Sequence, residues 1–292
     1  MKTNSDEWIK SKSFKRNLSS DLINKLQKEP LYIDYLKADI FDHYVFPTIR
    51  INNIGFYYRG GLLFKYDKEG FHTHIKYAAA IEKENKNYLT EKELGNYKLA
   101  TNFSKNYSRI KENCSVYSGV EATGVSDIYN RYSYVGRSSG IVVLDIEVSL
   151  KSLNQDNNQD RIDILLYNIN ERKLKFVEAK HYSNSEIWSK YEAKVIRQIK
   201  RYEEQIKIKK AEIISEYNQY IGIINNLFGG ELPLIEDVAQ NVVLLIFGFD
   251  NDQKNGRLKT LITKNSRFKD MLTFPIGNVD QIKLNNLWKK TR

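Results

Sequence analysis

Residues 174–180 read LKFVEAK, which is the residue pattern of a strand that carries two charged groups on one side. In an extended strand, side chains two residues apart point to the same face. Phe176, Glu178 and Lys180 therefore share one face. The stretch predicts a β-strand that holds a carboxylate and an ammonium group side by side.

A second strand-like stretch lies just before the first. Residues 161–167 read RIDILLY, and the turn-prone residues 168–171, NINE, join the two. Two apolar runs separated by a short polar turn are typical of a β-hairpin. Such a hairpin brings Asp163 toward Glu178 across the strand pair.

The bare pattern of an acidic residue, any residue and lysine is not specific by itself. It also begins at Glu84, Glu171, Glu192 and Asp252. Glu84 and Glu171 lie in turn-like segments, Glu192 lies in a helical pattern, and Asp252 has no acidic strand before it. Only Glu178 has the complete context of an apolar strand preceded by a strand with an acidic residue.

Phosphodiester hydrolysis requires carboxylates that hold Mg2+ against the scissile phosphate. It is also favoured by a cation near the attacking water, because negative charge develops there. Asp163 and Glu178 can supply the carboxylates, and Lys180 can supply the cation. The hairpin is therefore a candidate catalytic centre.

This arrangement resembles the PD-(D/E)xK nuclease superfamily, which has the restriction-endonuclease-like fold, over residues 118–205. Its RecB-like branch carries a Gln-x-x-x-Tyr motif on the helix after the Glu-x-Lys strand, and Gln198 and Tyr202 match that motif here. Apolar residues recur every three or four positions from about residue 185, as expected of an amphipathic helix. One departure is Ile162, which stands where the superfamily usually has proline before Asp163.

The resemblance implies an α/β fold with a mixed central sheet flanked by helices. It implies a Mg2+-dependent phosphodiester hydrolase in which Mn2+ can replace Mg2+. Asp163, Glu178 and the carbonyl of Ala179 would then bind the metal, and Lys180 would position or activate the attacking water. Gln198 and Tyr202 would support the metal ligands or contact the nucleic-acid backbone.

Two residues are candidates for a further acidic ligand, and the sequence leaves the choice open. Glu147 lies in residues 141–150, IVVLDIEVSL, where alternation predicts an apolar face and a polar face that holds both Asp145 and Glu147. Glu121 lies in the helix-like residues 119–129, where the resemblance implies a leading helical glutamate. Each acid could instead be a solvated surface group.

The chain is expected to have two parts. Residues 1–104 are predicted to form a helical and antiparallel β-meander module, with strands near residues 44–52, 54–59, 62–66 and 71–77. Residues 105–292 are predicted to form the nuclease-like domain.

Basic and aromatic residues of the meander are candidates for nucleic-acid contact, among them Arg59, Lys65 and Lys76. The favoured interpretation of the aromatic rings is that they fill the sheet's apolar side. His181 and Tyr182 directly follow Lys180 and are candidates for substrate contact.

The histidines of residues 72–74, HTH, share one face of a predicted strand. No carboxylate-rich partner is evident beside them, so the favoured interpretation of His72 and His74 is a structural or surface role. The single cysteine, Cys114, excludes an internal disulfide and a cysteine-based zinc site, and it is expected to be a small buried residue.

The chain carries 46 basic and 36 acidic residues, a net charge of +10, which suits a protein that binds a polyanion. No apolar run approaches the roughly 20 residues of a membrane span, and the polar start is unlike a signal peptide, so a cytoplasmic protein without membrane contact is expected.

The resemblance favours DNA over RNA and a role in restriction, phage defence or repair. A catalytically inactive nucleic-acid-binding protein, an RNA-cleaving effector, and a homodimer or partner subunit stay open.

Overall fold

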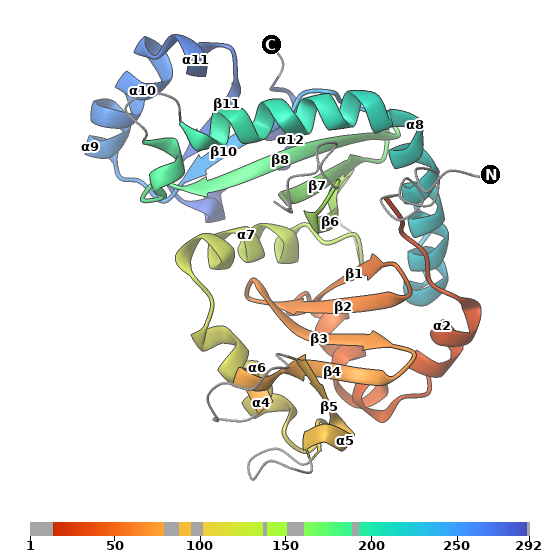
Figure 1. Ribbon diagram of the computed structural model, residues 1–292. Helices are drawn as coiled ribbons and strands as arrows, with labels where there is room; N and C mark the ends of the chain where they lie inside the picture. The colour runs from red at the N-terminus through yellow and green to blue at the C-terminus, as the bar shows by residue number, and fades with distance from the viewer. Residues whose placement is uncertain are drawn as a thin grey trace, which may run out of the picture. The chain divides into compact units, whose positions relative to one another are not determined.

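The chain is a mixed α/β protein, and the computed structural model describes residues 14–78, 88–94, 102–136, 139–150, 161–188 and 193–290. Figure 1 shows its two compact units. The first comprises Met1–Lys15, Ser139–Ile221 and Leu232–Arg292, and the second comprises Arg16–Ser138 and Gly222–Glu231. None of the helices in the described ranges has the length and hydropathy that crossing a bilayer requires.

The first unit is built on a six-stranded mixed sheet with the order β11-β10-β8-β7-β6, in which β9 also pairs with β8. The pairs β6–β7 and β7–β8 are antiparallel, whereas β10 runs parallel to both β8 and β11. The hairpin expected from residues 161–180 is confirmed. The strands are β6 (Ile141–Val148), β7 (Ile162–Asn168), β8 (Lys173–His181), β9 (Asp237–Val238), β10 (Val243–Phe247) and β11 (Leu272–Ile276).

Strand β10 lies between β11 and β8 and is buried along its whole length. Its residues are all apolar because parallel strands are usually covered on both faces. Short helical turns connect β10 to β11, and others follow β8 and β11. They are α9 (Asn251–Gln253), η3 (Lys254–Leu258), α10 (Lys259–Lys264), α11 (Ser266–Lys269), η2 (Ser185–Ile187) and η4 (Val279–Gln281).

A long helix, α8 (Lys194–Phe228), runs along one face of the sheet (Figure 1). Its buried residues include Ile199, Ile206 and Ile213, which recur at the spacing of an amphipathic helix. The helix ends before Gly229, whose φ of 67° is the left-handed conformation common just after a helix. Near the C-terminus, α12 (Leu284–Trp288) packs through Trp288, whose carbonyl accepts a hydrogen bond from Lys175.

The second unit contains a five-stranded antiparallel sheet in sequential order, which confirms the predicted meander. Aromatic side chains of the meander fill its apolar side, as the favoured interpretation predicted: Phe56 and Phe64 are buried in the core, and the Phe56–Phe71 centroids lie 5.9 Å apart. The strands are β1 (Phe46–Arg50), β2 (Asn53–Tyr58), β3 (Gly61–Asp67), β4 (Gly70–His74) and β5 (Tyr88–Thr90). The helices are α2 (Ser20–Leu26), η1 (Tyr32–Leu36), α3 (Lys37–Phe41), α4 (Ile75–Ala78), α5 (Glu91–Leu94), α6 (Tyr107–Val116) and α7 (Val120–Arg131).

The division of the chain differs from the predicted boundary between residues 104 and 105. Helices α6 and α7 belong to the second unit because they pack against its sheet. The ring of Tyr107 stacks on Phe64 at 6.1 Å, and the backbone N–H of Gly60 donates to the hydroxyl of Tyr129 over 2.9 Å. Cys114 is buried against the same sheet, as expected, with its sulfur 3.6 Å from the carbonyl oxygen of Tyr58.

Candidate active site

Two carboxylates lie opposite each other on the central hairpin. The register pairs Ile164 with Val177, so the next position along the antiparallel ladder places Asp163 opposite Glu178. The backbone N–H of Ala179 donates to Asp163 Oδ2 over 2.7 Å. This contact holds the Asp163 side chain against strand β8, as the sequence predicted, whereas a metal-binding role for the Ala179 carbonyl stays a prediction.

Lys180 follows two residues after Glu178 and points to the same side. Its Nζ atom lies 2.8 Å from Glu178 Oε1, and both side chains are almost fully buried. Lys180 also forms an ion pair of 3.2 Å with Glu186 on the turn η2, and Glu186 contacts Lys194 at the start of α8. Glu186 was not predicted from the sequence, because nothing in a local pattern indicates that this turn folds back over strand β8.

The electrostatics of the site follow from this close packing. Burial raises the pKa of Asp163 well above its ordinary value, and the negative charge of Glu178 raises it further. The positive charge of Lys180 and the Ala179 N–H act in the opposite direction but do not outweigh these effects. Burial and the charge of Glu178 therefore oppose ionisation of Asp163, and a divalent cation between the two carboxylates would favour the ionised form.

Glu147 also belongs to this site. It stands between the paired positions Ile146–Ile164 and Val148–Ile162, which places it opposite Asp163, and its charge contributes to the raised pKa of Asp163. Its φ of 50° is unusual for a non-glycine residue. Its carboxylate lies 3.4 Å from the guanidinium of Arg161.

Asp145 does not join Glu147 on a polar face, so that expectation was wrong. A β-bulge between Val143 and Asp145 shifts the register of β6. Asp145 is fully buried, and its Oδ2 accepts a hydrogen bond of 2.7 Å from the hydroxyl of Tyr217 on helix α8. It is a core carboxylate rather than a ligand candidate.

Gln198 and Tyr202 lie on helix α8, and together they contact the backbone just before strand β7. Gln198 Nε2 donates to the Tyr202 hydroxyl over 2.7 Å, and that hydroxyl donates to the carbonyl of Arg161 over 2.8 Å. The pair therefore supports the strand that carries Asp163. The buried Oε1 atom of Gln198 has no hydrogen-bond partner among the described residues, so it could accept one from a water or substrate group.

Glu121 lies on helix α7 of the second unit, near the helix N-terminus. The other acidic candidates belong to the first unit. Because the positions of the two units relative to each other are not determined, a role for Glu121 at the centre stays a prediction.

His181 and Tyr182 lie where strand β8 ends. The His181 ring packs edge-on against Phe247 at 5.5 Å, and Tyr182 packs in the same manner against Trp188 at 4.9 Å. The guanidinium of Arg257 lies 4.0 Å above the centre of the Trp188 ring. Both predicted residues are half-exposed beside Lys180, and their contact with substrate stays a prediction.

Arg59, Lys65 and Lys76 all lie in the second unit. The guanidinium of Arg59 lies 5.8 Å from the centre of the Tyr58 ring, and the ammonium of Lys76 lies 5.3 Å from that of Tyr117. Lys65 forms an ion pair of 2.7 Å with Asp67. The structure does not test their proposed contact with nucleic acid.

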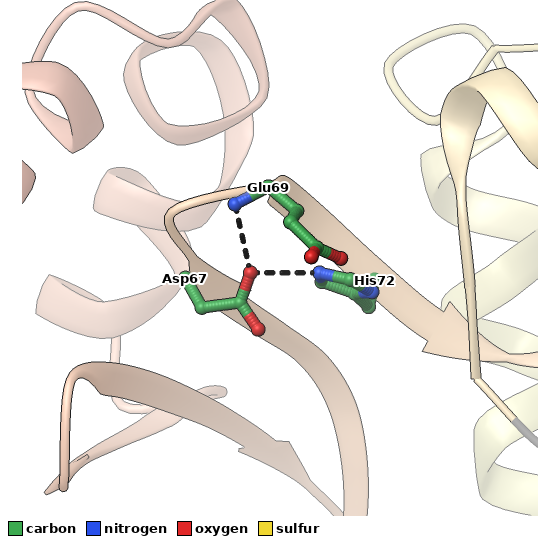
Figure 2. Close-up of side chains that lie close together, drawn as sticks. All are labelled: Asp67, Glu69 and His72. Carbon is green, nitrogen blue, oxygen red and sulfur yellow. Dashed lines mark hydrogen bonds and ion pairs between the residues drawn. The ribbon is translucent and has the colours of Figure 1, made fainter.

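A second group of metal-binding side chains lies on the hairpin between β3 and β4, where Asp67, Glu69 and His72 could hold a metal ion (Figure 2). A structural or surface role was expected for His72, because no carboxylate-rich partner is evident beside it in the sequence. The partners lie only a few residues earlier, and the hairpin turn brings them back to the histidine. The spacing Asp-x-Glu-x-x-His across a predicted turn was the signal that was missed.

No protein-family model, curated protein or solved structure matches the chain significantly. The interpretation of both groups of residues therefore depends on their own chemistry and geometry.

Proposed function

We propose that the protein is a metal-dependent nuclease of the PD-(D/E)xK superfamily, with Asp163, Glu178 and Lys180 at its catalytic centre. The observation that carries this proposal is the position of two carboxylates opposite each other on neighbouring strands, with the Lys180 ammonium beside them. The order of β7, β8 and α8 along the chain agrees with the order of elements in that superfamily. We propose on this basis that the first unit has a restriction-endonuclease-like core.

The acidic residues fit a hard divalent cation. Mg2+ prefers oxygen ligands and commonly binds through one or two carboxylates while it keeps several waters. Asp163 and Glu178 would provide those carboxylates, and Glu147, opposite Asp163, is the additional ligand that the geometry favours. When bound, Mg2+ or Mn2+ would polarise the scissile phosphate and make a bound water more acidic.

The surrounding residues would act on the substrate and on one another. Lys180 would stabilise the negative charge that develops near the attacking oxygen, and its burial strengthens that interaction. Glu186 would keep the Lys180 ammonium in place. Gln198 and Tyr202 would fix the start of β7 and with it the position of Asp163.

The substrate class we propose is DNA. The net charge of +10 favours a polyanion, and the superfamily that the chain resembles acts mostly on DNA. A role in restriction, phage defence or repair would follow from that resemblance.

The proposal is tested with purified protein and four substrates: linear duplex DNA, circular duplex DNA, single-stranded DNA and RNA. Each is incubated with Mg2+, Mn2+ or EDTA. The test variants are Asp163→Asn and Lys180→Met, and the matched control is Lys173→Met, which changes a lysine of the same strand that pairs with Asp237 outside the centre. We expect metal-dependent cleavage that falls by at least about 100-fold in both test variants and persists in the control.

The other outcomes separate the alternatives. Cleavage of RNA alone would replace the DNA assignment with an RNA-cleaving effector. Binding without cleavage, equal in the wild type and both test variants, would contradict the catalytic proposal and favour a nucleic-acid-binding protein.

A further inference from the structure

The hairpin between β3 and β4 carries three side chains of the types that bind transition metals. One ligand atom each from Asp67, Glu69 and His72 lies within 4.8 Å of the other two. Figure 2 shows both carboxylates close to the His72 ring, with a dashed line that joins the Asp67 carboxylate to the ring. All three residues belong to the second unit, so this cluster is separate from the acidic residues of the first unit.

The distances suit a shared ion. His72 Nε2 lies 2.9 Å from Asp67 Oδ1. Two ligands bound to one tetrahedral Zn2+ at about 2.0–2.1 Å would lie roughly 3.3 Å apart. A small widening of the existing contact would therefore let both atoms coordinate the same ion.

The turn also holds these groups in place before any ion binds. The backbone N–H of Glu69 donates to Asp67 Oδ1 over 3.0 Å, which closes the turn. The ammonium of Lys65 binds Asp67 Oδ2 at 2.7 Å and so fixes the orientation of the carboxylate. His72 is buried, whereas Glu69 is exposed. The ring is thus fixed by packing, and the cluster opens to solvent on the Glu69 side.

We infer that Asp67, Glu69 and His72 form a second metal site, which binds a divalent transition-metal ion of the Zn2+ type through two carboxylate oxygens and one imidazole nitrogen. The imidazole decides the class of ion, because Zn2+, Co2+ and Ni2+ bind it well whereas Mg2+ prefers oxygen ligands. Three protein ligands leave a coordination position for water. This site does not depend on the proposed nuclease activity.

The test uses the full-length protein stripped of metal and titrated with Co2+, whose visible absorption reports coordination by nitrogen and oxygen ligands. We expect one Co2+ to bind at this site, to be displaced by Zn2+ and to resist excess Mg2+. Glu69→Gln and His72→Gln should each weaken binding by more than about 10–100-fold, the loss caused by changes to outer-shell partners alone. His74→Gln is the matched control, because His74 lies on the same strand and its Nδ1 accepts the Lys76 N–H instead.

Two results with the variants would overturn the inference, and so would one result with the wild type. One is unchanged Co2+ affinity in Glu69→Gln; this residue is exposed, so its variant is expected to fold normally even if the buried His72→Gln does not. The other is loss of the Co2+ signal in Asp163→Asn, which would assign the bound ion to the first unit. A wild type that binds no Co2+ or Zn2+ would also overturn it.

Discussion

The ammonium nitrogen of Lys180 lies 3.2 Å from a carboxylate oxygen of Glu186. The same nitrogen lies 2.8 Å from Glu178, so two carboxylates from different elements hold one buried cation. Glu178 is a proposed metal ligand, whereas Glu186 lies on the turn η2 and is itself held by Lys194. Glu186 is therefore a positioning residue for Lys180.

Replacing Glu186 with glutamine tests this role. The variant Glu186→Gln keeps the shape of the side chain but removes its charge, so the Lys180 ammonium is held less firmly. We expect the cleavage rate to fall by about 10-fold or more, as for other outer-shell changes, with little change in substrate affinity. The measurement is the rate at saturating DNA beside the DNA dissociation constant.

Glu236→Gln is a suitable control, because Glu236 is an exposed glutamate paired with Arg172 outside the centre. An unchanged rate in Glu186→Gln would show that Glu178 alone positions Lys180.

Asp163→Asn is expected to stabilise the metal-free protein at neutral pH. Burial and the charge of Glu178 raise the folded-state pKa of Asp163, so the protonated carboxyl is the favoured form in the fold. The protonated Asp163 carboxyl contributes fully to the stability of the fold below the pKa of about 4 that it has in the unfolded chain. This contribution is lost as the pH rises through the pKa that Asp163 has in the folded protein. A neutral asparagine side chain avoids that loss of stability, and its amide oxygen can still accept the hydrogen bond from the Ala179 N–H.

Thermal melting in EDTA across this pH range measures the effect. The melting temperatures of the wild type and Asp163→Asn should converge at acidic pH and separate toward neutral pH, with the variant higher. Mg2+ should raise the melting temperature of the wild type more than that of the variant. A variant that melts below the wild type at neutral pH in EDTA would contradict this electrostatic account.

The buried carboxylate of Asp145 predicts unequal effects of two tyrosine changes on helix α8. Tyr217→Phe removes the hydroxyl that donates to Asp145 Oδ2 over 2.7 Å, and Tyr220→Phe removes one that donates to the carbonyl of Leu144 over 3.0 Å. Both rings are fully buried, so packing is matched. Hydrogen bonds to charged groups contribute about 1.5–3 kcal/mol, against about 1 kcal/mol for neutral ones.

We therefore expect Tyr217→Phe to lower the free energy of unfolding by more than Tyr220→Phe does. Urea denaturation of both variants measures the difference. Equal losses would contradict a stronger hydrogen bond from Tyr217 than from Tyr220.

Gly248 is expected to tolerate no side chain. Its φ is 77°, and a Cβ atom there would lie 2.1 Å from His181 Nε2. Gly248→Ala should therefore displace the His181 ring, and the left-handed backbone adds about 1–3 kcal/mol of strain. Because His181 follows Lys180, we also expect weaker substrate binding.

The contrasting variant is Gly222→Ala, since a Cβ atom at this helical position meets nothing within 4 Å. It should stabilise the protein by about 0.5–1 kcal/mol. Unfolding free energies of both variants check the pair, and a Gly248→Ala protein as stable as the wild type would show that His181 moves freely.

The elements that depend on neighbouring residues were predictable from the sequence. Alternating residues indicated the hairpin of β7 and β8, and the turn between them was enough to place Asp163 opposite Glu178. The apolar spacing indicated the amphipathic helix α8. These features follow from periodicity and turn chemistry, which operate over a few residues.

Other features were decided only by the tertiary structure. The bulge in β6 buried Asp145 against Tyr217, and the turn η2 placed Glu186 beside Lys180. Helices α6 and α7 joined the meander because their aromatic side chains pack there. Local sequence patterns indicated which residues could carry the chemistry and placed Asp163, Glu178 and Lys180 on their strands. Which of them share a buried, charged environment was set by contacts between distant segments, and no local pattern encodes these.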